Sequence, residues 1–182
     1  MSEKIYTFKS IKTLRLQIRM FQKEDREAYF DLFSNPLVMQ YLPIEPFQKR
    51  EEARKALEKI AFEYENGLFY RLAVEEIYSK ECIGYIGLSR MMQRQGTCEV
   101  VYAYREAFWN KGYAGEALAA YVAFLENTYH TIIGGHVDEN KVSGYVLEKC
   151  GFVRKPDLDT EMTIHGNKKH IYNYIKERKQ SK

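Results

Sequence analysis

The stretch from residue 99 to residue 118 combines residue types that bind phosphate. Apolar and aromatic residues alternate over residues 100–104 as on one face of a strand, residues 110–112 have turn composition, and residues 114–125 are rich in helix formers. The first N–H groups of a helix have no intrahelical partner, and with the helix dipole they attract a pyrophosphate without a metal ion. Gly112 lets the backbone approach such a ligand closely. The sequence therefore predicts a phosphate-binding loop between a strand and a helix.

Two familiar phosphate loops are excluded by spacing. The chain has no Gly-x-x-x-x-Gly-Lys-Ser/Thr run, and no Gly-x-Gly-x-x-Gly follows the first strand of a parallel unit. The pattern that remains runs Trp109-Asn110-Lys111-Gly112-Tyr113-Ala114-Gly115. It resembles the acetyl-CoA loop of the GNAT N-acetyltransferase superfamily, usually written Gln/Arg-x-x-Gly-x-Gly/Ala. The resemblance implies that these seven residues bind acetyl-CoA as co-substrate, whereas a helix start without a ligand would explain the loop alone.

Two further segments add to this resemblance. Asn140 and Ser143, followed by Gly151-Phe152, are similar to the second superfamily signature, Asn-x-x-Ser/Ala with a helix and a closing Gly-Phe. Residues 13–19 and 35–42 resemble the ribosomal-protein N-terminal acetyltransferase branch, the Rim-type enzymes. The departures are Trp109, where Gln or Arg is commoner across the superfamily, and Asn110, where the branch often has Gly.

Hydrophobic periodicity predicts strands and helices along the whole chain. Strands are expected over residues 14–19, 69–75, 82–88, 98–104 and 131–137 and on both sides of the His165-Gly166-Asn167 turn, and helices over residues 24–33, 48–64, 114–125 and 141–150. Prolines 36, 43 and 46 are expected to break the stretch between the first two helices. The predicted fold is one α/β domain over residues 1–182, with a mixed, mostly antiparallel sheet of about seven strands flanked by about four helices. The family resemblance implies that this sheet splays between its fourth and fifth strands and holds the pantetheine arm there.

Acetyl transfer from a thioester to an amine needs a neutral nucleophile, a polarised carbonyl and a protonated leaving sulfur, none of which requires a metal. The resemblance implies that backbone N–H groups around Val101 and Tyr102 polarise the carbonyl, and an ordinary strand ladder is the alternative. Glu99 begins this strand. In related enzymes a Glu here acts as general base, often through water, although a solvated cap or an ion-pair partner would also explain it.

The start of the helix over residues 141–150 supplies the other candidates. Asn140 is expected to hydrogen-bond the pantetheine arm. Ser143 is the candidate donor to the departing thiolate, because Leu147 stands where many superfamily members place an acid Tyr. Tyr145 could replace Ser143 if its ring turned inward. A helix cap would explain Ser143 without any chemistry.

The leading interpretation is an acetyl-CoA-dependent N-acetyltransferase that acts on a primary amine by direct attack in a ternary complex. A peptide N-terminus is favoured slightly over a small-molecule amine. At pH 7 about one α-amine in ten is neutral, against about one lysine ε-amine in 2,500, so a weak base is enough for an α-amine. The resemblance places the acceptor between the loops at residues 35–47 and 154–166. A non-catalytic CoA-binding sensor or interaction domain is the alternative. In that case Leu147, in place of the acid Tyr, would indicate that catalytic activity has been lost.

Composition and residue spacing bear on the partners, metal sites and cellular location of the protein. The net charge is only +3, with both signs interspersed, so no nucleic-acid partner is expected. Three widely spaced cysteines argue against disulfides and zinc sites, and the histidines lack metal spacing. No apolar run is long enough for a membrane span, and a cytoplasmic protein is expected. A homodimer is the commonest oligomer. Arg15 and Arg19 are expected on the solvent face of the first strand.

Overall fold

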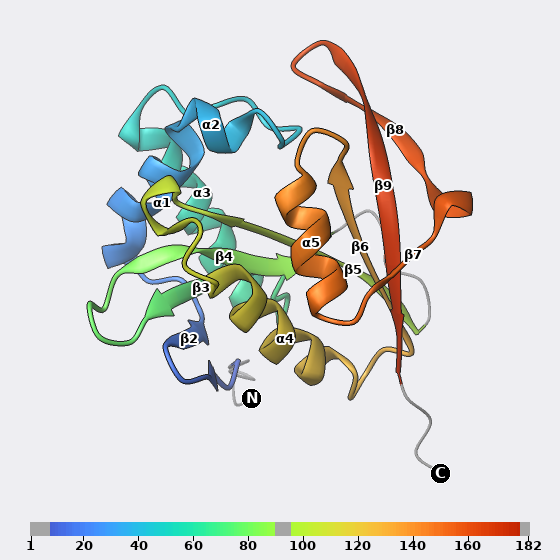
Figure 1. Cartoon of the computed structure of the whole chain (residues 1–182). Helices are drawn as coiled ribbons and strands as arrows, with labels where there is room; N and C mark the ends of the chain where they lie inside the picture. Colours follow the sequence, from blue (N-terminus) through green and yellow to red (C-terminus); the bar gives the residue numbers. More distant parts are fainter. Residues whose placement is uncertain (1–7, 90–95, 179–182) are drawn as a thin grey trace.

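The computed structural model describes residues 8–89 and 96–178. Within these residues nine strands form one sheet in the order β1-β2-β3-β4-β5-β6-β9-β7, with β8 paired to β9 (Figure 1). Neighbouring strands are antiparallel except β5 and β6, which are parallel. The strands are β1 (Ile11–Lys12), β2 (Leu16–Arg19), β3 (Arg71–Glu76), β4 (Cys82–Leu88), β5 (Thr97–Tyr104), β6 (Thr131–Val137), β7 (Val153–Arg154), β8 (Thr160–Ile164) and β9 (Asn167–Glu177).

Helices cover both faces of this sheet. They are α1 (Arg26–Ser34), α2 (Pro36–Met39), α3 (Arg50–Glu65), α4 (Tyr113–Leu125) and α5 (Lys141–Lys149), with single 3-10 turns at Lys23–Asp25, Glu106–Phe108 and Pro156–Leu158. Helices α4 and α5 lie in front of the sheet in Figure 1, while α1 and α3 lie on the opposite face. The side chains of β5 and of the residue that follows it show the same division. Tyr102 meets α5 through Ser143, whereas Arg105, three residues further along the extended chain, pairs with Asp31 on α1.

The predicted α/β fold is confirmed, and the strand count is slightly higher than expected. The differences are the two-residue strands β1 and β7, too short to show alternation, and helix α2. The sequence interpretation treated Pro36 as a helix breaker, but Pro36 occupies the first turn of α2, where the missing N–H costs nothing. Asn35 caps that helix by accepting a hydrogen bond from the N–H of Leu37 at 2.8 Å.

The sheet divides between β5 and β6. Strand β5 pairs with β4 as far as Gly84↔Tyr104, but with β6 only from Thr97↔Thr131 to Val100↔Gly134. Beyond Val100 the two strands separate, as Figure 1 shows. Helix α5 packs closely against β6 beside this opening, since a Cβ added at Gly134 would lie 2.5 Å from Leu147. The expected splay between the fourth and fifth predicted strands is therefore present.

The core beside the opening contains one buried hydroxyl without a hydrogen bond. Tyr104 is 6% exposed, and its Oη has no partner among the residues that the structure describes. An unpaired buried hydroxyl costs about 1–3 kcal/mol. Tyr104→Phe is therefore expected to raise the free energy of unfolding by about 1 kcal/mol, measured by urea titration.

Tyr64→Phe is the matched control for this prediction. The hydroxyl of Tyr64 accepts a hydrogen bond from the N–H of Phe21 at 3.2 Å and donates to the carbonyl of Arg71 at 2.5 Å. Its removal leaves two backbone groups unsatisfied and should lower stability. Destabilisation of similar size by both substitutions would show that Tyr104 has a partner in solution.

Candidate active site

The loop between β5 and α4 has a backbone that only a few residue types adopt. Asn110 and Gly112 both have positive φ, 59° and 78°, and Gly112 caps α4 in the left-handed region. Asn is among the few residues besides Gly that take this conformation at low cost. The departure from the family pattern at Asn110 is therefore compatible with a tight loop.

Three N–H groups precede the first hydrogen bond of α4. That bond runs from the N–H of Glu116 to the carbonyl of Gly112 at 3.2 Å, so the N–H groups of Tyr113, Ala114 and Gly115 have no intrahelical acceptor. A Cβ added at Gly115 would meet no atom within 4 Å, which shows open space beside the first turn. Unpaired donors, the positive end of the helix dipole and free space are what an anion needs.

The side chains of the loop support the backbone. Trp109 donates its indole N–H to the carbonyl of Tyr104 at 2.7 Å and so satisfies the last residue of β5 beyond the point where β6 has diverged. The ammonium of Lys111 lies 5.1 Å from the ring centroid of Phe108. Both contacts hold the loop in shape, and neither occupies the N–H groups at the start of α4.

Arg15 contacts the same loop and does not lie on a solvent face as predicted. Its Nη1 donates to the carbonyl of Lys111 at 2.9 Å, and its Nε pairs with Glu116 at 2.7 Å. The backbone N–H of Arg15 and the hydroxyl of Thr13 also donate to Glu116. Burial acts to raise the pKa of Glu116, but these hydrogen bonds outweigh it and lower that pKa below its usual value.

Arg19 also differs from the prediction. It is mostly buried, and its guanidinium pairs with Asp25 and Glu75, both at 2.7 Å. The alternation of β2 places Arg15 and Arg19 on polar positions, but strand periodicity does not distinguish a polar residue in water from one that meets a carboxylate of another element. Their partners are 101 and 56 residues away in sequence, Glu116 and Glu75 respectively.

The hydrogen-bond pattern of β5 separates Val101 from Tyr102. Ser89 donates its N–H to the carbonyl of Glu99 at 2.8 Å, and Arg105 donates to Ile83 at 2.9 Å. Odd-numbered residues of β5 therefore turn their backbone groups toward β4, and Val101 pairs with Gly87 there. The N–H of Tyr102 points to the other side, where β6 has separated. Of the two predicted donors, the structure places only Tyr102 at the opening.

Glu99 lies on the α1 face of the sheet, opposite α5. It is partly buried, and its carboxylate is hydrogen-bonded to Ser89. Burial raises the pKa of Glu99, and the hydrogen bond from Ser89 opposes this only in part. A carboxylate with a raised pKa beside an opening is better matched to proton transfer near neutral pH than a solvated one.

Ser143 and Tyr102 meet across the opening. Their side-chain oxygens lie 2.9 Å apart, and burial raises the pKa of the Tyr102 hydroxyl. Asn140 caps α5, with its Oδ1 accepting from the N–H of Ser143 at 3.4 Å, so that Asn140 and not Ser143 is the N-cap. Tyr145 does not turn inward: it is 59% exposed, with the ammonium of Lys149 5.2 Å from its ring centroid.

The phenol of Tyr102 was not found by sequence reasoning, which considered only the backbone of this residue. The available signal was its even position in β5, shared with the buried Cys98, Val100 and Tyr104, because that position turns the side chain toward the helix that carries Ser143. Leu147, at the position of the family's acid Tyr, is fully buried against β6.

The two loops expected around the acceptor touch each other. Nε2 of His165, in the β8–β9 turn, lies 2.9 Å from the carbonyl of Met39 at the end of α2. Asp159, in the loop at residues 154–166, is hydrogen-bonded by Arg154 and His170, and Arg154, the largest influence, lowers its pKa to about 2. It is therefore committed to local ion pairs.

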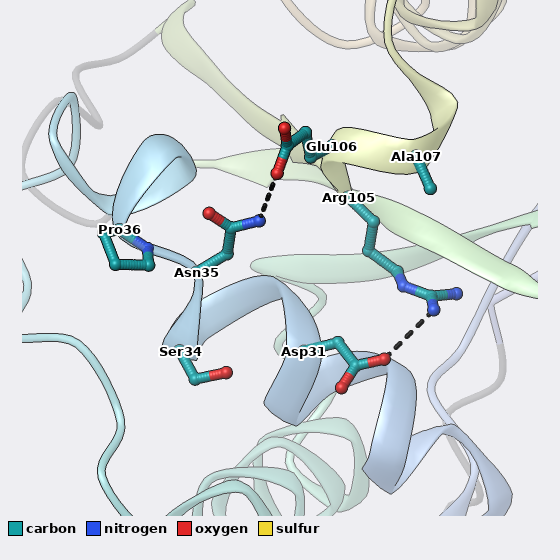
Figure 2. A pocket seen from close by; sticks show the side chains of 7 residues that line it. All are labelled: Asp31, Ser34, Asn35, Pro36, Arg105, Glu106 and Ala107. Atoms are coloured by element: carbon teal, nitrogen blue, oxygen red, sulfur yellow. Dashed lines mark hydrogen bonds and ion pairs between the residues drawn. The ribbon is translucent and has the colours of Figure 1, made fainter.

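A polar cavity opens beside the end of β5, between α1 and the turn that precedes Trp109 (Figure 2). It measures about 470 Å³. Its lining residues are Asp31, Ser34, Asn35, Pro36, Arg105, Glu106 and Ala107. Figure 2 shows two polar contacts across it: Asn35 donates to Glu106 at 2.8 Å, and Arg105 pairs with Asp31 at 3.0 Å.

Two features are absent from the part of the chain that the structure describes. No group of three or more His, Cys, Asp or Glu side chains in residues 8–89 and 96–178 is arranged to hold a metal ion. Over the same residues, no helix has both the length and the apolar character needed to span a bilayer.

The fold and the site define an acyltransferase architecture of the GNAT type, and sequence comparison identifies the family. The family model described as acetyltransferase (GNAT) domain matches residues 15–153. The chain therefore belongs to the GNAT acetyltransferase family, and it is an enzyme of the N-acetyltransferase class. The family predicted from the loop at Gly112 and the signature at Asn140 is confirmed.

Individual relatives agree with this assignment. The chain is 29% identical over 175 residues to the uncharacterized N-acetyltransferase YoaA of Bacillus subtilis (strain 168), covering 94% of this chain and 99% of that protein. It is similar to the crystal structure of a GNAT-family acetyltransferase from Bacillus anthracis, with a TM-score of 0.80, 27% identity and coverage of 93% and 99%. A ribosomal-protein-S5-alanine acetyltransferase from Vibrio fischeri has the same fold, with a TM-score of 0.79, 18% identity and coverage of 94% and 97%.

Proposed function

We propose that this protein transfers an acetyl group from acetyl-CoA to a primary amine by direct attack in a ternary complex. The observation that carries the proposal is the opening between β5 and β6, which leads from three N–H groups without an intrahelical acceptor at the start of α4 to Glu99 on one face and Ser143 on the other. Proteins of the same fold support the choice of cofactor: a ribosomal α-N-protein acetyltransferase was solved with coenzyme A, and a microcin self-immunity acetyltransferase with acetyl-CoA.

The proposed binding mode follows the opening. The pyrophosphate binds the N–H groups of Tyr113, Ala114 and Gly115 at the positive end of α4. The pantetheine arm lies between β5 and β6, where the side-chain amide of Asn140 donates to it. The thioester carbonyl accepts from the N–H of Tyr102, a donor held in place by pairing with β4.

Glu99 is the proposed general base. The acceptor amine attacks the carbonyl carbon, the C–N bond forms, and the amine proton passes to Glu99 directly or through water. The C–S bond of the thioester then breaks, and its electron pair leaves on sulfur as the thiolate of CoA. An α-amine pays only about 1 kcal/mol to become neutral at pH 7, against about 4–5 kcal/mol for a lysine. A carboxylate with a raised pKa is a sufficient base for the former, which favours a peptide N-terminus over a lysine side chain.

Ser143 is the proposed donor to the departing thiolate. The pKa of the Tyr102 phenol is raised above about 10, whereas a free thiol has a pKa of about 8.5, so transfer of the phenol proton to the sulfur is uphill by at least about 2 kcal/mol. Tyr102 therefore keeps its proton. In the proposed arrangement its hydroxyl, 2.9 Å from that of Ser143, donates to Ser143, so that the Ser143 hydroxyl can hydrogen-bond the sulfur. The pair stabilises the thiolate until it is protonated elsewhere.

Ser143→Ala tests this assignment. Because a hydrogen bond to a charged group contributes about 1.5–3 kcal/mol, kcat should fall roughly tenfold to a hundredfold with unchanged affinity for CoA. Tyr102→Phe should have a smaller effect, since it removes only the group that orients Ser143. Val142→Ala, at an exposed neighbouring position, is the control. Equal kcat for Ser143→Ala and the control would remove Ser143 from the mechanism.

A covalent acetyl-cysteine is not part of the proposal. Cys82 and Cys98 are buried, and burial raises the pKa of each thiol to about 12. Burial also raises the pKa of Cys150. Thiols of this kind are poor nucleophiles at neutral pH, so direct transfer is the better mechanism. Three free cysteines also fit a reducing compartment, and we place the reaction in the cytoplasm.

Calorimetric titration with acetyl-CoA and CoA tests the proposal, followed in the same preparation by thiol release with a panel of N-terminal peptides and small amines. Binding together with amine-dependent thiol release is the expected result. Binding without release by any amine would favour a CoA-binding sensor of the same fold. Absence of binding would show that the loop at Gly112 is only a helix start.

A further inference from the structure

We infer that Arg15 is a positioning residue for the phosphates of CoA, acting through the loop and through Glu116. This inference rests on the proposed function. Arg15 comes from the segment between β1 and β2, nearly a hundred residues before the loop. Its guanidinium contacts the carbonyl of Lys111 in that loop and the carboxylate of Glu116 in the first turn of α4.

The first effect is geometric. In a trans peptide the carbonyl of one residue and the N–H of the next point in opposite directions. Arg15 holds the carbonyl of Lys111 at 2.9 Å from outside the loop, which turns the N–H of Gly112 toward the inside. That N–H directly precedes the free donors of Tyr113, Ala114 and Gly115 at the start of α4. The hydrogen bond from Arg15 to Lys111 therefore orients the N–H of Gly112, the first of these consecutive donors.

The second effect is electrostatic. Glu116 lies in the first turn of α4, where a carboxylate interacts well with the helix dipole but repels a phosphate bound at the same helix end. Arg15 neutralises it with an ion pair at 2.7 Å, and the side chain of Glu116 is only 18% exposed. A phosphate bound at the start of α4 therefore meets N–H donors and the positive end of the helix dipole, and the negative charge of Glu116 is compensated.

Only the planar fork of an arginine can produce both effects at once. Nε and Nη1 bind Glu116 and Lys111 at the same time, and the guanidinium carbon lies 4.5 Å from the ring centroid of Tyr113, which fixes the plane of the group. A lysine supplies the same charge from one nitrogen, so it can neutralise Glu116 but cannot bridge both acceptors. The two effects can therefore be measured separately.

The test compares Arg15→Ala, Arg15→Lys and the double variant Arg15→Ala/Glu116→Gln with wild type. Affinities for CoA and dephospho-CoA, which both carry the pyrophosphate, are measured by calorimetry, and the affinity for pantetheine, which lacks phosphates, by NMR titration. Arg15→Ala should weaken both phosphate-bearing ligands about tenfold or more and leave pantetheine unchanged. Arg15→Lys and the double variant should each recover part of the loss, because each removes the uncompensated charge but not the geometric defect.

Arg50→Ala is the matched control, since it removes an arginine from an exposed ion pair with Glu27 far from the loop in sequence. It should leave all three affinities unchanged. Equal weakening of CoA and pantetheine by Arg15→Ala, or no weakening of either, would overturn the inference, and no recovery in the double variant would overturn its electrostatic part. If Arg15→Ala does not fold, Arg15→Lys is compared with wild type directly: weaker binding of CoA and dephospho-CoA with unchanged binding of pantetheine supports the inference, and equal affinities for all three ligands overturn it. Failure of wild type to bind CoA would instead reject the proposed function.

Discussion

Glu99→Gln is expected to lower kcat about 10²- to 10⁴-fold, the usual contribution of a general base, while the affinity for CoA remains unchanged. The amide keeps the size of the side chain and its hydrogen bond to Ser89 but cannot accept a proton. In the wild-type enzyme, kcat/KM should fall as the pH is lowered through the raised pKa of Glu99, because the base must be ionised. This acid limb should be absent from the residual activity of the variant.

The same substitution is expected to stabilise the fold at neutral pH. Because the pKa of Glu99 is raised in the folded state, the folded protein loses stability as the pH rises from the unfolded value of about 4.3 through the folded value, and the loss is complete above it. Gln cannot ionise and avoids this loss. The gain in melting temperature should therefore be present at pH 7 and should disappear as the pH approaches 4.

Glu58→Gln, at an exposed position on α3, is the control for both measurements and should change neither kcat nor the pH profile. A structural carboxylate at position 99 would behave differently: its removal would lower the melting temperature, and kcat would change only in proportion to the folded fraction. Full activity of Glu99→Gln across the pH range would exclude Glu99 as the base.

Gly112→Val is expected to weaken CoA binding about tenfold or more, measured by calorimetry. Residue 112 has a φ of 78°, which costs an ordinary residue about 1–2 kcal/mol and is more unfavourable still for a β-branched side chain. Relief of this strain would rotate the peptide units at the start of α4 and turn the N–H groups of Tyr113 and Ala114 away from the ligand. A lower melting temperature should accompany the loss of affinity.

Gly166→Val separates backbone strain from loss of the binding site. Gly166 lies in the β8–β9 turn with a φ of 77°, and a Cβ there would meet no atom within 4 Å. The substitution introduces the same strain far from the loop in the fold. It should lower the melting temperature to a similar degree without changing the affinity for CoA. Similar weakening of CoA binding by both variants would show that the effect of Gly112→Val is a general loss of stability.

Most of the fold could be predicted because its elements carry complete periodic patterns. The bounds of β4 and β6 match the predicted strands, and α4 begins one residue before its predicted start. The elements that were missed are short. Helix α2 has only four residues, too few for a periodic pattern, and its start depends on the pairing of a capping Asn35 with Pro36.

The candidate site was predictable where its chemistry lies in the backbone of one segment, as in the loop around Gly112. It was not predictable where two segments must meet. The contact of Tyr102 with Ser143 spans 41 residues, and that of Arg15 with Glu116 spans 101. Both depend on which face of a strand meets which helix, and that is decided by the packing of the whole sheet, not by local spacing.

Trp109 is the only tryptophan of the chain, and its indole is fixed by the hydrogen bond to Tyr104 where β5 passes into the loop. Fluorescence that is excited selectively in tryptophan therefore comes from a single site in the protein. Trp109 is 36% exposed, so its emission is sensitive to the polarity of whatever lies against the indole. The protein carries its own fluorophore at the entrance of the proposed cofactor site, and rapid-mixing fluorescence can follow occupancy of that site without a label.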